Sequence, residues 1–230
     1  MPTILITGCN RGIGLELTKH FSKANYKIHA CCRTPETSGE LQSLASSNSN
    51  ITIHKLDVSN HNEIEQLAKT LKGEAIDILL NNAGIYGKTP ASFGNIDYKN
   101  WEEVFKINTI APMKMAESFI DNIVASDLKI IANISSKVGS IADNSSGGSY
   151  TYRSSKTALN MVTKSLSVDL ADKGITAIAL HPGWVKTDMG GPNALIDTKK
   201  SVSGLAAIIL STDLSKSGKF FNYDGSEISW

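Results

Sequence analysis

Residues 3–14 read TILITGCNRGIG, a short run of β-branched and apolar residues that ends in three closely spaced glycines. The run predicts a first strand, and the apolar stripe over 12–24 predicts a first helix. Gly8, Gly12 and Gly14 lie between them, where glycines permit a tight turn and let the backbone approach a pyrophosphate at the helix N-terminus. The placement favours a dinucleotide site, although a turn that needs positive φ and binds nothing would read the same way.

The alternation of strand and helix continues along the whole chain. Further strands are predicted over 27–32, 51–56, 76–80, 129–134, 176–180 and 218–222, and further helices over 60–72, 98–126, 152–173 and 199–213. Most strands are continuously apolar, as expected when helices cover both faces of a sheet. The order predicts an α/β fold: a Rossmann-type, doubly wound parallel sheet of about seven strands in one domain, 1–230. Two long segments, 137–151 and 182–199, follow strands and should open at the carboxyl edge, where ligands bind.

Composition excludes several classes of protein. Hydrophobic residues make up 41% and charged residues 20% of the 230 residues, so the chain is neither disordered nor fibrous. Lys plus Arg number 23 against 22 Asp plus Glu, which argues against nucleic acid or an anionic membrane as partner. No apolar run approaches the roughly 18 residues of a membrane span, and no signal-peptide pattern opens the sequence, so a cytoplasmic location is predicted. Cys9, Cys31 and Cys32 read as free thiols, and no metal site is expected because no second ligand pair has suitable spacing.

The end of the second predicted strand indicates which dinucleotide binds. Sites selective for NAD place an acid there, against the ribose 2′-hydroxyl. Here the strand ends in Arg33, and the first acid is Glu36. Arg33, together with Arg11 from the glycine turn, would bind a 2′-phosphate through guanidinium forks. The pair therefore favours NADPH/NADP+, although either arginine alone could be a solvated surface charge.

Tyr152 and Lys156 lie four residues apart at the start of a predicted helix and so share one of its faces. A phenol has a pKa of about 10, and a neighbouring ammonium lowers that pKa towards a range useful for proton transfer. The pair predicts a general acid/base, while the spacing alone is more typical of a solvent-exposed pair. Ser135 and Ser136 end the preceding strand at the same edge, where a hydroxyl could hold a substrate carbonyl. Asn108 is a weak helix former in an apolar setting, where its amide needs a partner.

In chain order these motifs resemble those of the short-chain dehydrogenase/reductase family. They are TGxxxGxG at 7–14, Asp57-Val58, NNAG at 81–84, Asn108, Ser135-Ser136, YxxxK at 152–156 and Pro182-Gly183. The resemblance spans essentially the whole chain. It is closest to the Sniffer-type carbonyl reductases and C-factor-like proteins, through 4–12, 180–191 and 222–225.

The resemblance implies a role for each matching residue. Tyr152 would exchange a proton with a carbonyl or alcohol, and Lys156 would lower the pKa of Tyr152 and bind the nicotinamide ribose. Ser136, or alternatively Ser135, would orient the carbonyl, and Asn108 would hold a water between Lys156 and bulk solvent. The implied cofactor-binding residues are Gly8, Asn10, Arg11, Gly12, Ile13, Gly14, Arg33, Asp57, Val58, Asn81, Ala83, Gly84, Tyr152, Lys156, Pro182, Gly183, Val185 and Thr187. The candidates to line the substrate pocket are Tyr86, Val138, Trp184 and Met189, for which ordinary loop packing is an equal alternative.

The implied function is NADPH-dependent reduction of an apolar aldehyde, ketone or quinone, since the candidate pocket residues are mostly apolar or aromatic. Two alternatives remain open: an NADP-binding regulatory or developmental signalling protein with incidental catalysis, and an NADP-dependent alcohol or steroid dehydrogenase working in the oxidative direction. The partner would be a small-molecule carbonyl or alcohol. Pairing through the helices near 98–126 and 152–173, common in this family, would give a homodimer or homotetramer.

Overall fold

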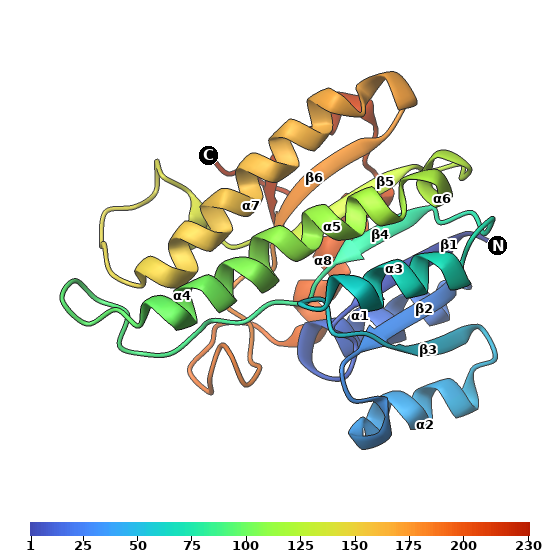
Figure 1. The fold of residues 1–230 in the computed structure, drawn as a ribbon, viewed down its shortest axis with the longest axis horizontal. Helices are drawn as coiled ribbons and strands as arrows, with labels where there is room; N and C mark the ends of the chain where they lie inside the picture. The colour runs from blue at the N-terminus through green and yellow to red at the C-terminus, as the bar shows by residue number, and fades with distance from the viewer.

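Seven parallel strands form the centre of the computed structural model, which describes residues 1–230 (Figure 1). In chain order they are β1(Thr3–Thr7), β2(Lys27–Cys32), β3(Ile51–Lys55), β4(Ile78–Asn81), β5(Ile130–Ile134), β6(Thr176–His181) and β7(Phe220–Asn222). Their spatial order is β3-β2-β1-β4-β5-β6-β7, so the winding reverses between β1 and β4. A reversal of this kind opens a crevice at the carboxyl ends of the two strands, where doubly wound sheets bind ligands.

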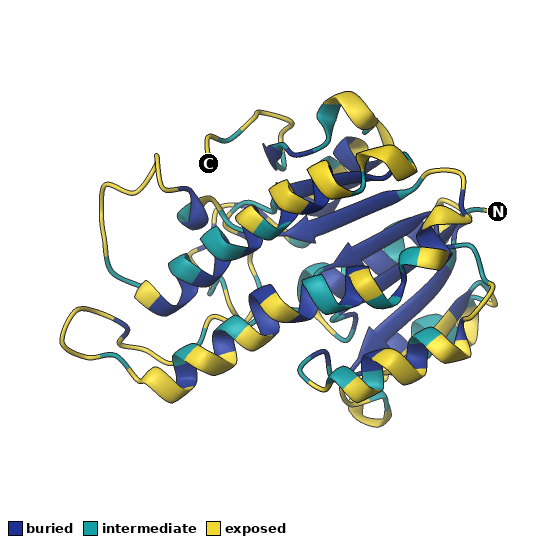
Figure 2. Ribbon diagram, turned by 45° about the horizontal axis from the view of Figure 1, so that its top comes forward, coloured by how far each residue is buried: buried dark blue, intermediate teal, exposed yellow.

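Helices cover both faces of the sheet. They are α1(Gly12–Lys23), α2(Gly39–Ser47), α3(His61–Thr70), α4(Tyr98–Phe105), α5(Ala111–Ser118), α6(Ile120–Val124), α7(Tyr150–Asp169) and α8(Thr198–Leu210). One apolar core lies between the sheet and α1, α2 and α8, and a second lies between the sheet and α3, α5, α6 and α7. Most strands are therefore buried on both sides, whereas the edge strand β3 is partly exposed (Figure 2). The predicted doubly wound parallel sheet is confirmed.

Alternate residues of one strand point to opposite faces of the sheet and so pack in different cores. In β1, Ile4 and Ile6 contribute to the core under α1 and α8, while Leu5 contributes to the core under α3 and α5. All five residues of β1 and of β5 are buried. Continuous apolar strands follow because a polar residue on either face would lose its water.

Two helical features differ from the prediction. The stretch predicted as one helix over 98–126 is divided into α4, a π-helical turn over Lys106–Ile110, α5 and α6. Pro112, which has no backbone N–H to donate, lies in the first turn of α5, where that donor is not needed. Helix α2 was not predicted: it is short, and only Leu41 of its nine residues is fully buried, with Leu44 and Ala45 packed against the core at its edge.

The loops after β4, β5 and β6 extend from the same edge of the sheet (Figure 1). The loop after β5 runs to the start of α7 at Tyr150, and the loop after β6 runs to the start of α8 at Thr198. Both long segments predicted to open at the carboxyl edge do so. None of the helices combines the length and the apolarity that a membrane span requires.

Candidate active site

A cleft of about 510 Å³ crosses the carboxyl edge of the sheet beside the β1–β4 reversal. Its lining joins the glycine turn, the ends of β2 and β4, the start of α7 and the loop after β6. The predicted site residues in this lining are Gly8, Asn10, Arg11, Gly12, Ile13, Gly14, Arg33, Asp57, Val58, Ala83, Gly84, Tyr152, Lys156, Pro182, Thr187 and Met189. Residues distant in sequence thus share one cavity.

The glycine turn leaves the start of α1 open to a ligand. Gly8 and Gly12 have φ values of 73° and 56°, which favour glycine. Asn82 Nδ2 fixes the turn by donating to the carbonyls of Thr7, at 2.8 Å, and Gly8, at 3.2 Å. No side chain caps α1, and no acidic residue lies in its first turn. Free N–H groups and the positive end of the helix dipole therefore face the cleft, which fits the pyrophosphate of a dinucleotide.

Both arginines predicted to bind a 2′-phosphate line the cleft, together with a third cation, Lys186. Arg11 Nη1 donates to Asp188 Oδ2 at 2.7 Å, so an exposed ion pair joins the glycine turn to the loop after β6. Glu40 also lines this part of the cleft. Arg33 has no ion-pair partner within 4.0 Å, so its guanidinium donors remain available to a phosphate.

Tyr152 and Lys156 are both buried, with 9% and 4% of their surface exposed. Burial raises the pKa of Tyr152 to about 12, and the nearby Tyr86 adds to the increase, while a hydrogen bond with Ser136 opposes it. Burial lowers the pKa of Lys156 to about 8. Its Nζ lies 5.8 Å from the Tyr152 ring centroid and donates to the Ile134 carbonyl at 2.8 Å. The protein groups alone therefore raise the Tyr152 pKa instead of lowering it as expected, because desolvation outweighs the other contributions.

The two adjacent serines have different partners. The Ser135 hydroxyl is buried and donates to Asn160 Oδ1 at 2.6 Å. Ser136 instead interacts with the Tyr152 phenol and opposes the increase of its pKa. This difference favours Ser136 over Ser135 as the group that could orient a carbonyl beside the phenol.

Asn108 lies in the π-helical turn and is fully buried. Its Oδ1 accepts from the Ile85 N–H at 2.9 Å, and its Nδ2 donates to the Ile85 carbonyl at 2.8 Å and to Ser155 Oγ at 3.1 Å. The amide thus fixes the segment that follows β4. A Cβ on Gly84 would lie 3.2 Å from Asn108 Oδ1 and 3.5 Å from Lys156 Nζ. The absence of a side chain at Gly84 therefore leaves room for both groups. The water predicted between them stays a prediction.

Three residues predicted to bind the cofactor do not line the cleft. Asn81 is buried in the sheet, where its Nδ2 donates to Asn133 Oδ1 at 2.9 Å. Val185 is buried and forms a β-bridge with Ile196. Gly183 has a φ of 85° and also packs against Ile196. These residues shape the walls behind the cleft.

Of the four candidates for a substrate pocket, Met189 lines the cleft. The Tyr86 ring stacks on the Tyr152 ring, with centroids 4.6 Å apart and planes inclined by 30°. Trp184 is half exposed, and its Nε1 donates to the Gly190 carbonyl at 2.7 Å. Val138 lies in the loop after β5 and does not line the cleft.

Several cleft residues were not predicted as site residues. They are Cys32, Glu40, Leu56, Asn82, Ile85, Ile107, Ile134, Lys186 and Asp188, together with Ser135, which was predicted only as an alternative to Ser136. Asn82 belongs to the NNAG motif, so this motif could have identified it as a site residue. Lys186 and Asp188 flank the predicted Thr187, but nothing in the sequence indicated that Asp188 would meet Arg11.

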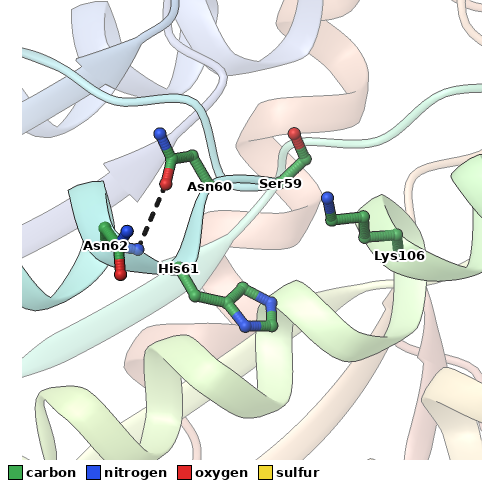
Figure 3. Close-up of a pocket in the computed structure, with 5 residues that line it drawn as sticks. All are labelled: Ser59, Asn60, His61, Asn62 and Lys106. Carbon is green, nitrogen blue, oxygen red and sulfur yellow. Dashed lines mark hydrogen bonds between the residues drawn. The ribbon is translucent and has the colours of Figure 1, made fainter.

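A second, smaller hollow lies at the N-terminus of α3 (Figure 3). Among its lining residues the only hydrogen bond drawn is from the Asn62 N–H to Asn60 Oδ1, at 3.2 Å. The lining is entirely polar and contains Ser59, Asn60, His61, Asn62 and Lys106. It includes none of the predicted site residues, so the larger cleft is the candidate active site.

Comparison with known proteins agrees with this geometry. C-signal of Myxococcus xanthus is 41% identical over 155 residues, which are 67% of this chain and 93% of that protein. The structure of carbonyl reductase Sniffer of D. melanogaster matches with a TM-score of 0.93 and 36% identity over 100% of both chains. The NADPH-bound carbonyl reductase from chicken fatty liver matches with a TM-score of 0.93 and 35% identity over 100% of this chain and 99% of that one. The family model of the short chain dehydrogenases matches residues 2–195, and the chain belongs to the short-chain dehydrogenase/reductase family.

Proposed function

We propose that the protein is an NADPH-dependent carbonyl reductase, with Tyr152 as the proton donor. One observation carries the proposal: a single cleft joins the open glycine turn, Arg11 and Arg33 to the buried Tyr152–Lys156 pair. A dinucleotide bound at the turn would therefore extend towards the phenol. Likeness to a carbonyl reductase structure that holds NADPH supports the same assignment.

Each group of the chain has a distinct task in this proposal. NADPH, when bound, supplies the hydride. The turn and the α1 N-terminus bind the pyrophosphate, and Arg11 and Arg33 bind the 2′-phosphate. Ser136 orients the substrate carbonyl, and Tyr152 donates a proton to its oxygen.

The pKa of Tyr152 is consistent with its role as a proton donor. At a pKa of about 12 the phenol carries its proton throughout the neutral range, as a donor must. The charged form of Lys156 still predominates near neutral pH, because its pKa of about 8 lies above that range.

Exposed apolar side chains support an apolar aldehyde, ketone or quinone as substrate. Met189 lines the cleft, and Trp184, from the same loop after β6, is half exposed. Apolar and aromatic walls suit a substrate whose only strongly polar group is its carbonyl.

The proposal is tested by titrating the protein with NADPH and NADH and then adding hexanal, acetophenone and naphthoquinone while the nicotinamide absorbance is followed. We expect NADPH to bind more tightly than NADH and to be consumed with at least one carbonyl. Tyr152→Phe should bind NADPH normally. Its turnover should be about 10²- to 10⁴-fold slower, the loss expected when a general acid is removed. Full activity of Tyr152→Phe would overturn the role of the phenol.

The likeness to C-signal favours a second candidate, an NADP-binding regulatory protein with incidental catalysis. Binding alone does not need Tyr152 or Ser136, so retention of both argues for the enzyme. Tight NADPH binding without turnover of any carbonyl would reverse this order.

We also propose self-association through the helices 98–126 and α7. Ile110, Met161 and Val168 expose apolar side chains on these elements. Light scattering after gel filtration would measure the oligomeric state, and a monomer at micromolar concentration would contradict the proposal.

A further inference from the structure

Tyr86 lies directly over the phenol that the proposed reaction uses. Its ring centroid is 4.6 Å from that of Tyr152, and the planes are inclined by 30°, so the two rings are in contact in a tilted arrangement. Tyr152 keeps only 9% of its surface exposed, whereas Tyr86 keeps 37%. Tyr86 therefore lies on the outer side of the pair, between the buried phenol and solvent.

The hydroxyl of Tyr86 is anchored at the start of α7. It forms a 2.9 Å hydrogen bond with Ser149 Oγ, and Ser149 immediately precedes the first residue of that helix. Tyr86 thus contacts the helix that carries Tyr152 at two points: the Tyr152 ring and the Ser149 hydroxyl.

The backbone on both sides of Tyr86 is fixed independently. The side chain of Asn108 bonds to both the N–H and the carbonyl of Ile85. On the other side, Gly87 has a φ of 88° and packs so closely on α4 that a Cβ would lie 2.7 Å from Val104. With the backbone fixed on both sides and the hydroxyl bonded to Ser149, the Tyr86 ring is held in contact with Tyr152.

We propose that Tyr86 is a positioning residue for Tyr152: its ring fixes the orientation of the phenol and keeps water from its outer face, and Ser149 anchors that ring. The inference rests on the proposed role of Tyr152 as proton donor. It differs from the expectation that Tyr86 contacts substrate, because a positioning residue acts equally on every substrate.

Three single variants and one double variant distinguish a positioning role of Tyr86 from a substrate contact. Tyr86→Leu keeps an apolar side chain but removes the flat ring, and should lower kcat about ten- to hundredfold for every carbonyl, since a misplacement of about 1 Å costs about 10²-fold. KM and the NADPH dissociation constant should stay unchanged. Tyr86→Phe and the matched Ser149→Ala each remove one side of the same hydrogen bond and should lower kcat about threefold. The double variant should be no slower than either single one, because both changes break one interaction.

A second readout does not depend on turnover. In protein isotope-labelled at tyrosine Cζ, the Tyr152 resonance is assigned with Tyr152→Phe and titrated by NMR. Because desolvation is the main cause of the high pKa of Tyr152, Tyr86→Ala should lower that pKa, and Ser149→Ala should leave it nearly unchanged. The acid limb of alcohol oxidation should move to lower pH in Tyr86→Ala by the same amount.

The outcomes are distinguishable. An unchanged Tyr152 titration in Tyr86→Ala would overturn the inference whether or not a substrate is known. A raised KM for large carbonyls with unchanged kcat in Tyr86→Leu would also overturn it, and would make Tyr86 a substrate contact. Full activity of Tyr152→Phe would overturn the proposed function instead. Folding is checked by circular dichroism and NADPH binding of each variant.

Discussion

Gly14 makes the tightest backbone approach in the glycine turn. Replacing it by alanine therefore tests whether the turn must be this close to bind a pyrophosphate. A Cβ at this position would lie 2.0 Å from the Gly8 carbonyl oxygen and 2.6 Å from Asn82 Nδ2. Real Cβ atoms essentially never approach closer than 3.0 Å, so the backbone has to move by about 1 Å. The movement separates the start of α1 from the turn between β1 and α1.

The energetic cost follows from what holds the turn. Asn82 Nδ2 donates to the carbonyls of both Thr7 and Gly8, and a shift of this size breaks at least one of these bonds. Overpacking costs about 1–3 kcal/mol, and a lost hydrogen bond costs about 1 kcal/mol more. The helix preference of alanine over glycine recovers at most about 1 kcal/mol. We therefore expect Gly14→Ala to lower the free energy of unfolding by about 2 kcal/mol.

Gly39→Ala is the matched control. Gly39 also begins a helix, α2, but a Cβ there would meet nothing within 4 Å. This variant should be neutral or more stable by about 0.5–1 kcal/mol. Urea unfolding followed by circular dichroism measures both changes, and NADPH titration should show weaker binding only for Gly14→Ala. Wild-type stability and NADPH affinity in Gly14→Ala would refute the reasoning.

Two further predictions concern charge. Arg33→Ala should weaken NADPH binding about 10- to 100-fold, as expected for lost hydrogen bonds to a charged group, and leave NADH binding unchanged; equal losses for both in a fluorescence titration would contradict the assignment. The folded pKa of Lys156 is about 8 against an ordinary 10.5, so between these values the unfolded chain binds a proton that the folded chain lacks. This group therefore makes the free energy of unfolding rise with pH, by up to about 3 kcal/mol. The stability of wild type relative to Lys156→Met should increase from about pH 8 to about pH 10 in urea unfolding; a constant difference would contradict the burial of the charge.

The sheet could be predicted because strands buried on both faces are mostly apolar, with any polar side chain paired inside, as Asn81 and Asn133 are. TILIT in β1 and IIANI in β5 leave no amphipathic alternative. Helix α2 was harder to predict, since the apolar stripe of GELQSLASS is only three residues long, Leu41, Leu44 and Ala45. The break at Lys106–Ile110 was also missed, because a π-helical turn depends on contacts that Asn108 makes with a distant segment.

Motif spacing located the cleft but not the contacts across it. Gly8, Gly12 and Gly14 are close in sequence, and their backbone requirements can be read locally. Arg11 and Asp188 are 177 residues apart, and their contact depends on where the loop after β6 lies above the turn. Contacts of this kind follow from tertiary structure alone.

The pKa of Tyr152 could not be predicted from spacing, because desolvation of both groups decides it. Burial favours the neutral form of each group, so it raises the pKa of the phenol and lowers that of the ammonium. Both pKa values, about 12 for Tyr152 and about 8 for Lys156, lie above the near-neutral pH range. Tyr152 therefore keeps its proton there while Lys156 keeps its charge, and this combination suits donation of a proton to a carbonyl oxygen. The motif thus indicates an acid/base pair, and the burial of both groups determines which of them are protonated near neutral pH.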